Sequence, residues 1–236
     1  IAAELKVHKS TAFRLVTTLE RHNLVEQRGE RGRYRLGVGV LTLAGAVTTR
    51  LDLVQRGRPA VEWLAERTGE TVNITVLSDG AALYVDQVTG GGAIGTHNWV
   101  GQRIPLHATS NGKVLLAHLP AAGFAELLHK PLARFTERTI ADPAALRAEI
   151  GLVRRRGFAV AVDELETGLT AVAAPIAEAD GRVAASVSVS GPTFRLPADR
   201  VAGLSEHVIE AGRRISRSLG WPGPEGRVGE GRRAGR

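Results

Sequence analysis

The first part of the chain shows two different patterns of apolar and polar positions, one helical and one typical of short strands. Residues 9–22 carry apolar side chains at helical spacing, which predicts an amphipathic helix. The apolar positions are Ala12, Leu15, Val16 and Leu19. Two short runs, 24–26 and 34–36, flank a turn at 29–32 and predict a small hairpin. The opening "IAAELKV" has the pattern of a helix already under way.

The rest of the chain mixes helical and strand patterns. The apolar stretch 38–47, continuing toward Arg56, predicts a linker helix. Later helices are predicted at 59–68, 110–119, 121–128, 143–156 and 198–219, and strands at 71–78, 82–88, 93–97, around 104, 157–162, 170–178 and 183–191. Turn signals at Asp79-Gly80 and Asp180-Gly181 join neighbouring strands as hairpins. The prediction is an α+β fold with a mainly antiparallel sheet flanked by helices.

Charge is concentrated at the two ends of the chain. The net charge is +7. Residues 1–36 hold eight basic against four acidic side chains and residues 213–236 hold seven against two, which leaves the middle at −2. A polyanion would therefore meet the ends rather than the body. An ordinary solvated surface is the alternative. Residues 220–236, rich in Gly, Pro and Arg, are predicted to be a disordered basic tail.

Composition excludes several classes of chemistry. The chain has no cysteine, so disulfides, thiolate zinc sites and cysteine nucleophiles are ruled out. No window reaches the roughly 18 apolar residues of a membrane span, and no signal-peptide pattern is present, so we expect a cytoplasmic protein without membrane contact. The chain has no methionine, and we expect that residues originally preceded Ile1. No cofactor or metal is expected.

Polar residues at the start of the first amphipathic helix suggest contact with DNA. A helix fits the major groove of B-DNA, with its N-terminal polar residues at base edges and its basic residues on phosphates. Arginines in the hairpin would act as a wing along the DNA backbone. The candidate DNA-binding residues are Lys9, Ser10, Thr11, Arg14, Arg31 and Arg33. An ordinary surface helix and hairpin are the alternative.

Several separated motifs resemble one family. "IAAELKVHKSTAFRLVTTLERHNLVEQRGERGRYRLG" is similar to the winged helix-turn-helix of the IclR family of bacterial transcription regulators. "IPLHATSNGKVLLA", "RRRGFAVAVDELETGLTAVAAPI" and "DGRVAASVSVSGP" resemble the family's effector-binding domain. The resemblance covers the chain from Ile1 to about Leu219 and keeps the motifs in order.

The resemblance implies a domain organisation. Residues 1–37 would form a winged helix-turn-helix truncated at its start, 38–57 a linker helix, and 58–219 a GAF-like effector-binding and oligomerisation domain before the tail. It also implies a transcription regulator, commonly a repressor, that binds double-stranded operator DNA as a dimer or tetramer. A metabolite-sensing protein without productive DNA binding is the alternative.

The motif "HATSNGK" is the first candidate ligand site. It places Ser110, Asn111 and Gly112 where a helix would begin, and the free N–H groups there favour a carboxylate. The resemblance implies that a small effector lies against this turn. It adds Ala171, Ser188 and Ser190 to the site, while a frequent pocket acid is replaced by Ala161. Asp163 and Glu164 keep acidic character two and three residues later, and Asp163 is included in the predicted site. A strand with one polar face would also explain the two serines.

The sequence does not favour an enzyme. Ser110 with His97 or His107 lacks a G-x-S-x-G elbow and an orienting third residue. A metal site from those histidines with Asp163 or Glu164 matches no known ligand spacing. The glycine-rich "TGGGAIG" lacks the Lys-Ser/Thr of a phosphate loop and predicts a flexible connection.

Overall fold

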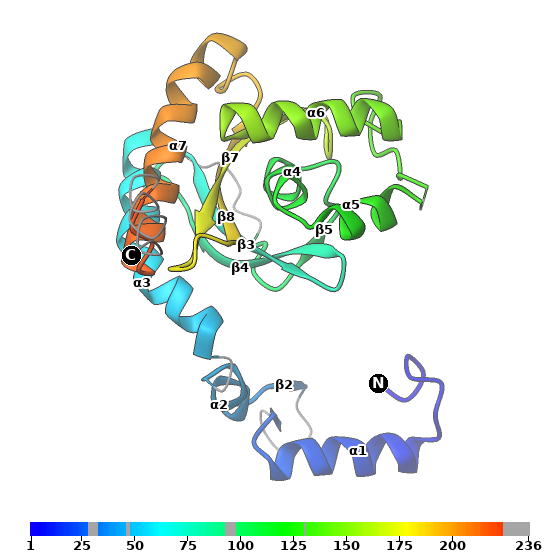
Figure 1. The fold of residues 1–236 in the computed structure, drawn as a ribbon. Coiled ribbons are helices and arrows are strands. Elements are labelled where there is room, and N and C mark those ends of the chain that lie inside the picture. The colour runs from blue at the N-terminus through cyan, green and yellow to red at the C-terminus, as the bar shows by residue number, and fades with distance from the viewer. Residues whose placement is uncertain (28–32, 46–47, 93–97, 130, 224–236) are drawn as a thin grey trace, which may run out of the picture. The chain divides into compact units, whose positions relative to one another are not determined.

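The chain folds into two compact units, Ile1–Asp52 and Leu53–Arg236. The structure is a computed structural model that describes residues 1–27, 33–45, 48–92, 98–129 and 131–223. Outside these residues lie the predicted turn at 29–32, the predicted strand at 93–97, Arg31, His97 and residues 224–236 of the predicted basic tail. Figure 1 shows the helices and strands of each unit.

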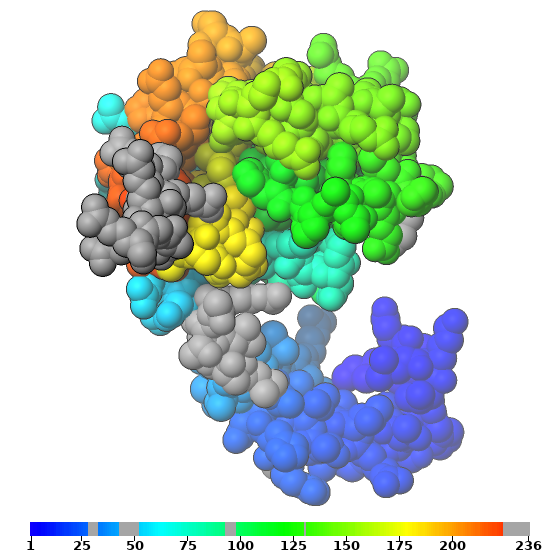
Figure 2. Space-filling model, viewed as in Figure 1, coloured from blue at the N-terminus to red at the C-terminus, as the bar shows by residue number. Residues whose placement is uncertain are grey.

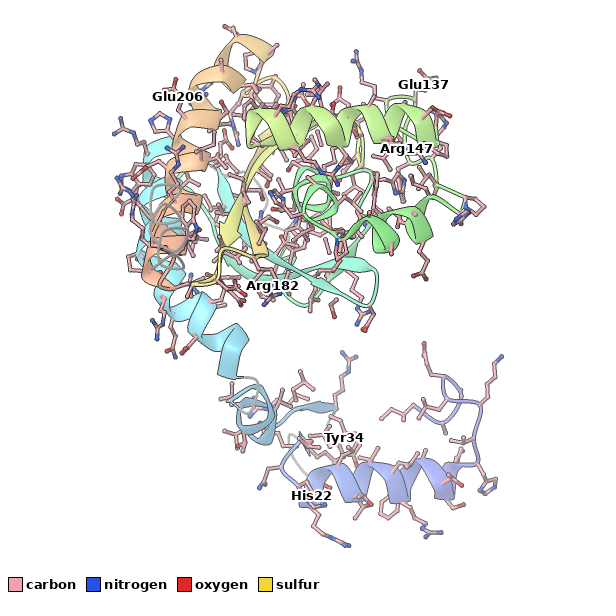
Figure 3. The ribbon with its side chains drawn as sticks, in the orientation of Figure 1. His22, Tyr34, Glu137, Arg147, Arg182 and Glu206 are labelled. Atoms are coloured by element: carbon pink, nitrogen blue, oxygen red, sulfur yellow. The ribbon has the colours of Figure 1, made fainter. Side chains whose placement is uncertain are left out.

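The first unit contains a helix, a two-stranded hairpin and a short second helix. Helix α1 (Lys9–Arg21) precedes β1 (Val25–Gln27) and β2 (Tyr34–Leu36), which pair antiparallel, and α2 (Gly39–Gly45) follows. Figure 3 labels His22 just after α1 and Tyr34 on β2. The predicted amphipathic helix and hairpin are therefore observed.

One predicted helix at the start differs from the structure. The segment "IAAELKV" forms a turn in which the Leu5 N–H donates to Ile1 O, rather than a helix. Lys6 has φ of 51°, outside the helical region, so the turn does not continue. The described residues of the predicted linker at 38–57 include α2 and the first half of α3 (Thr48–Thr68), and residues 46–47 lie outside the described part of the chain.

Helix α3 passes through Pro59, where a new helix was predicted to begin. A proline inside a helix removes one hydrogen bond and costs about 3 kcal/mol. Val61 and Leu64, which follow it, are fully buried in the core. Burial of each such side chain contributes about 1.5–3 kcal/mol, so packing offsets the cost of the proline.

Among the described residues, six antiparallel strands form the sheet of the second unit, in the order β5-β4-β3-β8-β7-β6. The strands are β3 (Thr71–Ser78), β4 (Ala81–Val88), β5 (Arg103–Ile104), β6 (Ala159–Val162), β7 (Leu169–Ala177) and β8 (Val183–Pro192). Asp79 and Gly80 both have positive φ, of 47° and 73°, as the tight turn between β3 and β4 requires. The predicted antiparallel sheet is confirmed.

Helices cover both faces of this sheet (Figure 1). Helices α3 and α7 (Ala198–Ser218) pack on one face in a core with β3, β7 and β8. Helices α4 (Ser110–Ala117), α5 (Ala121–Leu128) and α6 (Pro143–Arg156) pack on the other. Figure 2 shows α6 in lime at the surface of this second layer, beside the green of α4 and α5. The predicted α+β class, with helices flanking the sheet, is confirmed.

Candidate functional site

Helix α4 begins inside the second unit rather than at its surface. All eight of its residues are buried. Thr109 is the N-cap: its side chain accepts a hydrogen bond of 3.1 Å from Gly112 N and donates one of 2.9 Å to Pro105 O. The N–H groups of the first helical residues, Ser110 and Asn111, have no acceptor within the helix. A buried helix start with this polarity favours an anionic partner.

Strand β8 turns a row of serines toward α4. Ala185, Val187 and Val189 enter the core beneath α3 and α7, and because side chains alternate along a strand, Ser186, Ser188 and Ser190 face the other way. Asn111 joins this row to the helix. Its Nδ2 donates to Ser188 Oγ at 2.7 Å, and its Oδ1 accepts from Ser186 Oγ at 2.8 Å.

A cavity of about 100 Å³ lies between the start of α4 and this strand. Its polar lining includes the hydroxyls of Ser188 and Ser190, and Asn73 Nδ2 supports Ser190 Oγ from β3 at 3.3 Å. One wall is aromatic, with the Tyr84 and Trp99 ring centroids 5.8 Å apart. The full lining is Tyr84, Trp99, Ala108, Thr109, Ser110, Asn111, Ala161, Glu164, Leu165, Glu166, Leu169, Ala171, Ser188 and Ser190.

The Tyr84 phenol is neutral at neutral pH, and its burial favours this form further. Burial raises the pKa of Tyr84 to about 12, although a side-chain hydrogen bond with Asn111 acts in the opposite direction. At neutral pH the O–H is therefore available as a hydrogen-bond donor in the cavity.

A buried ion pair borders the same cavity. Lys113 Nζ lies 2.6 Å from Glu164 Oε1 and donates to Val160 O at 3.0 Å. The two side chains are 1% and 10% exposed. Burial raises the pKa of Glu164 more than the charge of Lys113 lowers it, and Glu164 Oε2 is buried without a hydrogen-bond partner among the described residues. This carboxylate is thus anchored through one oxygen only.

Five of the seven residues predicted to bind an effector meet in this cavity: Ser110, Asn111, Ala171, Ser188 and Ser190. Gly112 and Asp163 do not line it. A Cβ atom at Gly112 would lie 2.2 Å from Leu106 O, so this glycine allows α4 to pack against the preceding segment. Its N–H is already bonded to Thr109, which corrects the expectation that it is free.

Asp163 supports the loop that lines the cavity instead of facing into it. Its backbone has φ of 56°, and its Oδ1 accepts from Gly168 N and from Thr193 Oγ1, both at 2.8 Å. These bonds tie down the loop 163–168, which supplies Glu164, Leu165 and Glu166 to the lining. Asp163, which was predicted to bind the effector, is thus not part of the lining of this cavity.

Replacing Asp163 with alanine is expected to lower the free energy of unfolding by about 1–3 kcal/mol, because two hydrogen bonds are lost and alanine is strained at positive φ. Asparagine keeps the Oδ1 acceptor and tolerates this backbone conformation, so Asp163→Asn should lose less than about 1 kcal/mol. Urea denaturation of both variants measures the difference. Equal losses would contradict the supporting role.

Among the lining residues that were not predicted, three carry weak signals in the sequence. Tyr84 is one of only two tyrosines in the chain and lies on a strand otherwise rich in apolar residues. Trp99 lies just after the predicted strand at 93–97, outside any predicted element. Glu164 was considered as an acid beside Asp163 and as a metal ligand, and its direction depends on the positive φ of Asp163.

The first unit presents its predicted DNA-binding residues on its surface. Lys9, Ser10, Thr11 and Arg14 are exposed on α1, and Arg33 is exposed just before β2. Ala12 and Val16 are buried, so Arg14, two positions from each, lies on the opposite face of the helix. Arg31 lies outside the described residues.

One of the two histidines considered for catalysis, His107, makes a structural hydrogen bond. His107 places Nε2 2.8 Å from Ala133 O, a bond in which the ring nitrogen donates. No group of three or more His, Asp or Glu side chains suited to a metal occurs within the described part of the chain. Nor do those residues include a helix long and apolar enough to cross a membrane.

The first unit is a helix and hairpin with an exposed basic helix face, and the second is an α+β domain with an internal cavity. Together they indicate the class of helix-turn-helix regulators that carry an effector-binding domain. The family described as "Bacterial transcriptional regulator IclR C-terminal" matches residues 45–217, and the "IclR helix-turn-helix domain" matches residues 1–29. The chain belongs to the IclR family of bacterial DNA-binding transcriptional regulators.

Individual relatives agree with this assignment. The HTH-type transcriptional regulator BhcR of Paracoccus denitrificans is 36% identical over 217 residues, covering 92% of this chain and 78% of that protein. The transcriptional repressor IclR of Escherichia coli is 31% identical over 223 residues, covering 93% and 81%. A crystal structure of an IclR homolog from Microbacterium hydrocarbonoxydans, complexed with 4-hydroxybenzoate, has a TM-score of 0.84 at 31% identity and covers 92% of this chain and 88% of its own.

Proposed function

We propose that this regulator represses a catabolic or metabolic operon and that a small organic acid, bound in the cavity at the start of α4, controls its affinity for operator DNA. The observation that carries the proposal is the combination of a buried helix N-terminus with neutral hydroxyl donors in one cavity. A carboxylate can accept from the helix N–H groups and from Ser188, Ser190 and Tyr84 together.

The volume of the cavity favours a short aliphatic acid. At about 100 Å³ it is smaller than an engineered cavity of about 150 Å³ that binds benzene. The apolar part of the wall includes three small side chains, Ala108, Ala161 and Ala171, which suit contact with a short aliphatic chain. We infer an acid of about two to four carbons, which is smaller than the 4-hydroxybenzoate bound by the Microbacterium hydrocarbonoxydans homolog.

Repression and self-association complete the proposal. Relatives named as repressors support a repressor, among them the HTH-type transcriptional repressor AllR of Klebsiella pneumoniae at 34% identity. Operators with two half-sites require at least a dimer, so we propose that the chain acts as a dimer or tetramer. Its proposed location is the cytoplasm. The acid would act by binding more tightly to one arrangement of the helix-turn-helix units than to another.

The Arg14→Ala variant tests DNA binding through α1. Because Arg14 is exposed on the face opposite the buried residues, it is expected to contact phosphate. Its loss should weaken binding to operator and to unrelated DNA by a similar factor and reduce the slope of log K against log salt by about 1. The measurement is a titration of DNA from the chain's own promoter region over a salt series.

Arg147→Ala is the matched control, because it removes the same charge from an exposed position on α6, labelled in Figure 3. It should leave both the affinity and the slope unchanged. Equal slopes for the original chain and the Arg14 variant would count against a DNA contact at this residue.

One observation favours a second function, ligand sensing without productive DNA binding. Phe13, Leu15 and Leu19 on α1 are 67%, 48% and 40% exposed, an unusual amount of apolar surface for a helix that enters a DNA groove. The same salt series separates the two functions. A steep slope with preference for the promoter sequence supports the regulator, and equal binding to every sequence supports sensing alone.

A further inference from the structure

A second depression shares one lining residue, Glu164, with the α4 cavity. It is open, with a volume of about 410 Å³. Segments from α4, α6, β6 and the stretch 138–140 contribute to it. The lining is Lys113, Arg138, Ile140, Glu149, Arg156, Val160, Val162 and Glu164.

Charge in this depression is not balanced. Three cationic side chains, Lys113, Arg138 and Arg156, stand against the carboxylates of Glu149 and Glu164. Lys113 is committed to Glu164, and Arg156 donates to Glu149 Oε1 at 2.8 Å and to Phe158 O at 2.6 Å. One positive charge therefore remains without a compensating carboxylate in the lining.

Arg138 carries that remaining charge. Its side chain is exposed at the depression, and within the described part of the chain it has no hydrogen-bond or ion-pair partner, since only its backbone N–H is bonded, to Thr136 Oγ1. A guanidinium presents paired N–H donors that match two oxygens of one anion. Arg156, which is 30% exposed, has further N–H donors beyond those used by Glu149 and Phe158.

We propose that this depression binds a phosphate group, either inorganic phosphate or a phosphate monoester, through Arg138 and Arg156. Two guanidinium groups can donate to several oxygens of one phosphate at once, Arg138 through its whole fork and Arg156 through the N–H groups that Glu149 and Phe158 do not use. A simple carboxylate such as acetate has only two oxygens, so it can match one guanidinium group but not both.

The two carboxylates set an upper limit to the charge of the ligand. Glu149 and Glu164 lie in the lining and repel any polyanion that reaches the depression. A single phosphate group meets the one uncompensated positive charge, whereas a nucleic acid backbone would bring several phosphates. This site is therefore separate in chemistry from the proposed DNA contacts of α1, and it does not depend on the proposed effector.

The test is a calorimetric titration of the full chain with inorganic phosphate, methyl phosphate and acetate, with ionic strength held constant by sodium chloride. Saturable binding of inorganic phosphate or methyl phosphate is expected, and which of the two binds more tightly identifies the source of the group. Arg138→Ala should weaken it at least about tenfold, Arg138→Lys should restore part of the affinity, and Arg147→Ala should change nothing.

An Ala171→Leu variant, which fills the α4 cavity, locates the bound anion. Phosphate affinity should be unchanged in this variant, because Ala171 does not line the depression. The proposal is overturned if phosphate binding is lost in Ala171→Leu, if Arg138→Ala and the original chain bind alike, if no binding saturates, or if acetate binds as tightly as phosphate.

Discussion

Replacing Ala171 with leucine is expected to abolish binding of the organic-acid effector while leaving DNA binding intact. Ala171 lies on β7, pairs with Ser190 on β8, and lines the α4 cavity. Leucine adds three carbon atoms to a space of about 100 Å³, so an acid of about two to four carbons no longer fits. Effector affinity should fall at least about 100-fold, which corresponds to about 2.7 kcal/mol.

The measurement is a panel of short hydroxy and oxo acids titrated against the chain bound to its operator, with release of DNA as the signal. Ala125→Leu makes the same exchange at an exposed position of α5 and serves as the control. Both variants should bind operator without effector as the original chain does. An Ala171→Leu protein that still responds to the acids would show that the effector site is elsewhere.

Replacing Lys113 with alanine is expected to cause the largest loss of stability from a single exchange in the second unit. Its ammonium group is 1% exposed and neutralises Glu164 at 2.6 Å, besides donating to Val160 O. Removing it leaves the Glu164 carboxylate buried and unpaired, a change that costs about 3–5 kcal/mol in other proteins. For a unit of this size the melting temperature should fall by roughly 6–20 °C.

Chemical denaturation with an unchanged m-value measures this loss. The double variant Lys113→Met with Glu164→Leu removes both charges and should regain most of the stability, because it is the unpaired carboxylate that is costly. Arg147→Ala, an exposed exchange, should stay within about 0.5 kcal/mol of the original chain. A loss below about 1 kcal/mol for Lys113→Ala would show that the pair contributes little.

Local signals predicted most of the secondary structure. The Asp79-Gly80 pair marks the β3–β4 turn because few residues other than glycine and short polar ones tolerate positive φ. Gly157, with φ of 78°, ends α6 where the sequence predicted. The prediction that a new helix begins at Pro59 is wrong, because α3 continues through this residue. Burial of the helix on both sides of Pro59 outweighs the local preference of proline, and burial in the tertiary structure cannot be inferred from a local sequence pattern.

The candidate site was only partly predictable for a similar reason. Ser110 and Asn111 stand at a recognisable helix start, and Ser188 and Ser190 follow the alternation of a strand. Tyr84 and Trp99 reach the cavity from segments distant in the sequence, and their approach depends on the pairing of β3, β4 and β8. Whether the serines line a cavity or merely a polar strand face could not be decided before that pairing was known.

The sequence by itself determined the family, the order of the elements and the basic helix face, because capping, turn chemistry and side-chain periodicity act over a few residues. Only the tertiary structure decided which acid borders the cavity. Asp163 and Glu164 are adjacent and chemically alike, yet the positive φ of Asp163 and its bonds to Gly168 and Thr193 turn one toward the loop, while Lys113 on α4 draws the other to the cavity wall. The two acids therefore differ because packing brings them partners that are distant in the sequence, Thr193 for Asp163 and Lys113 for Glu164.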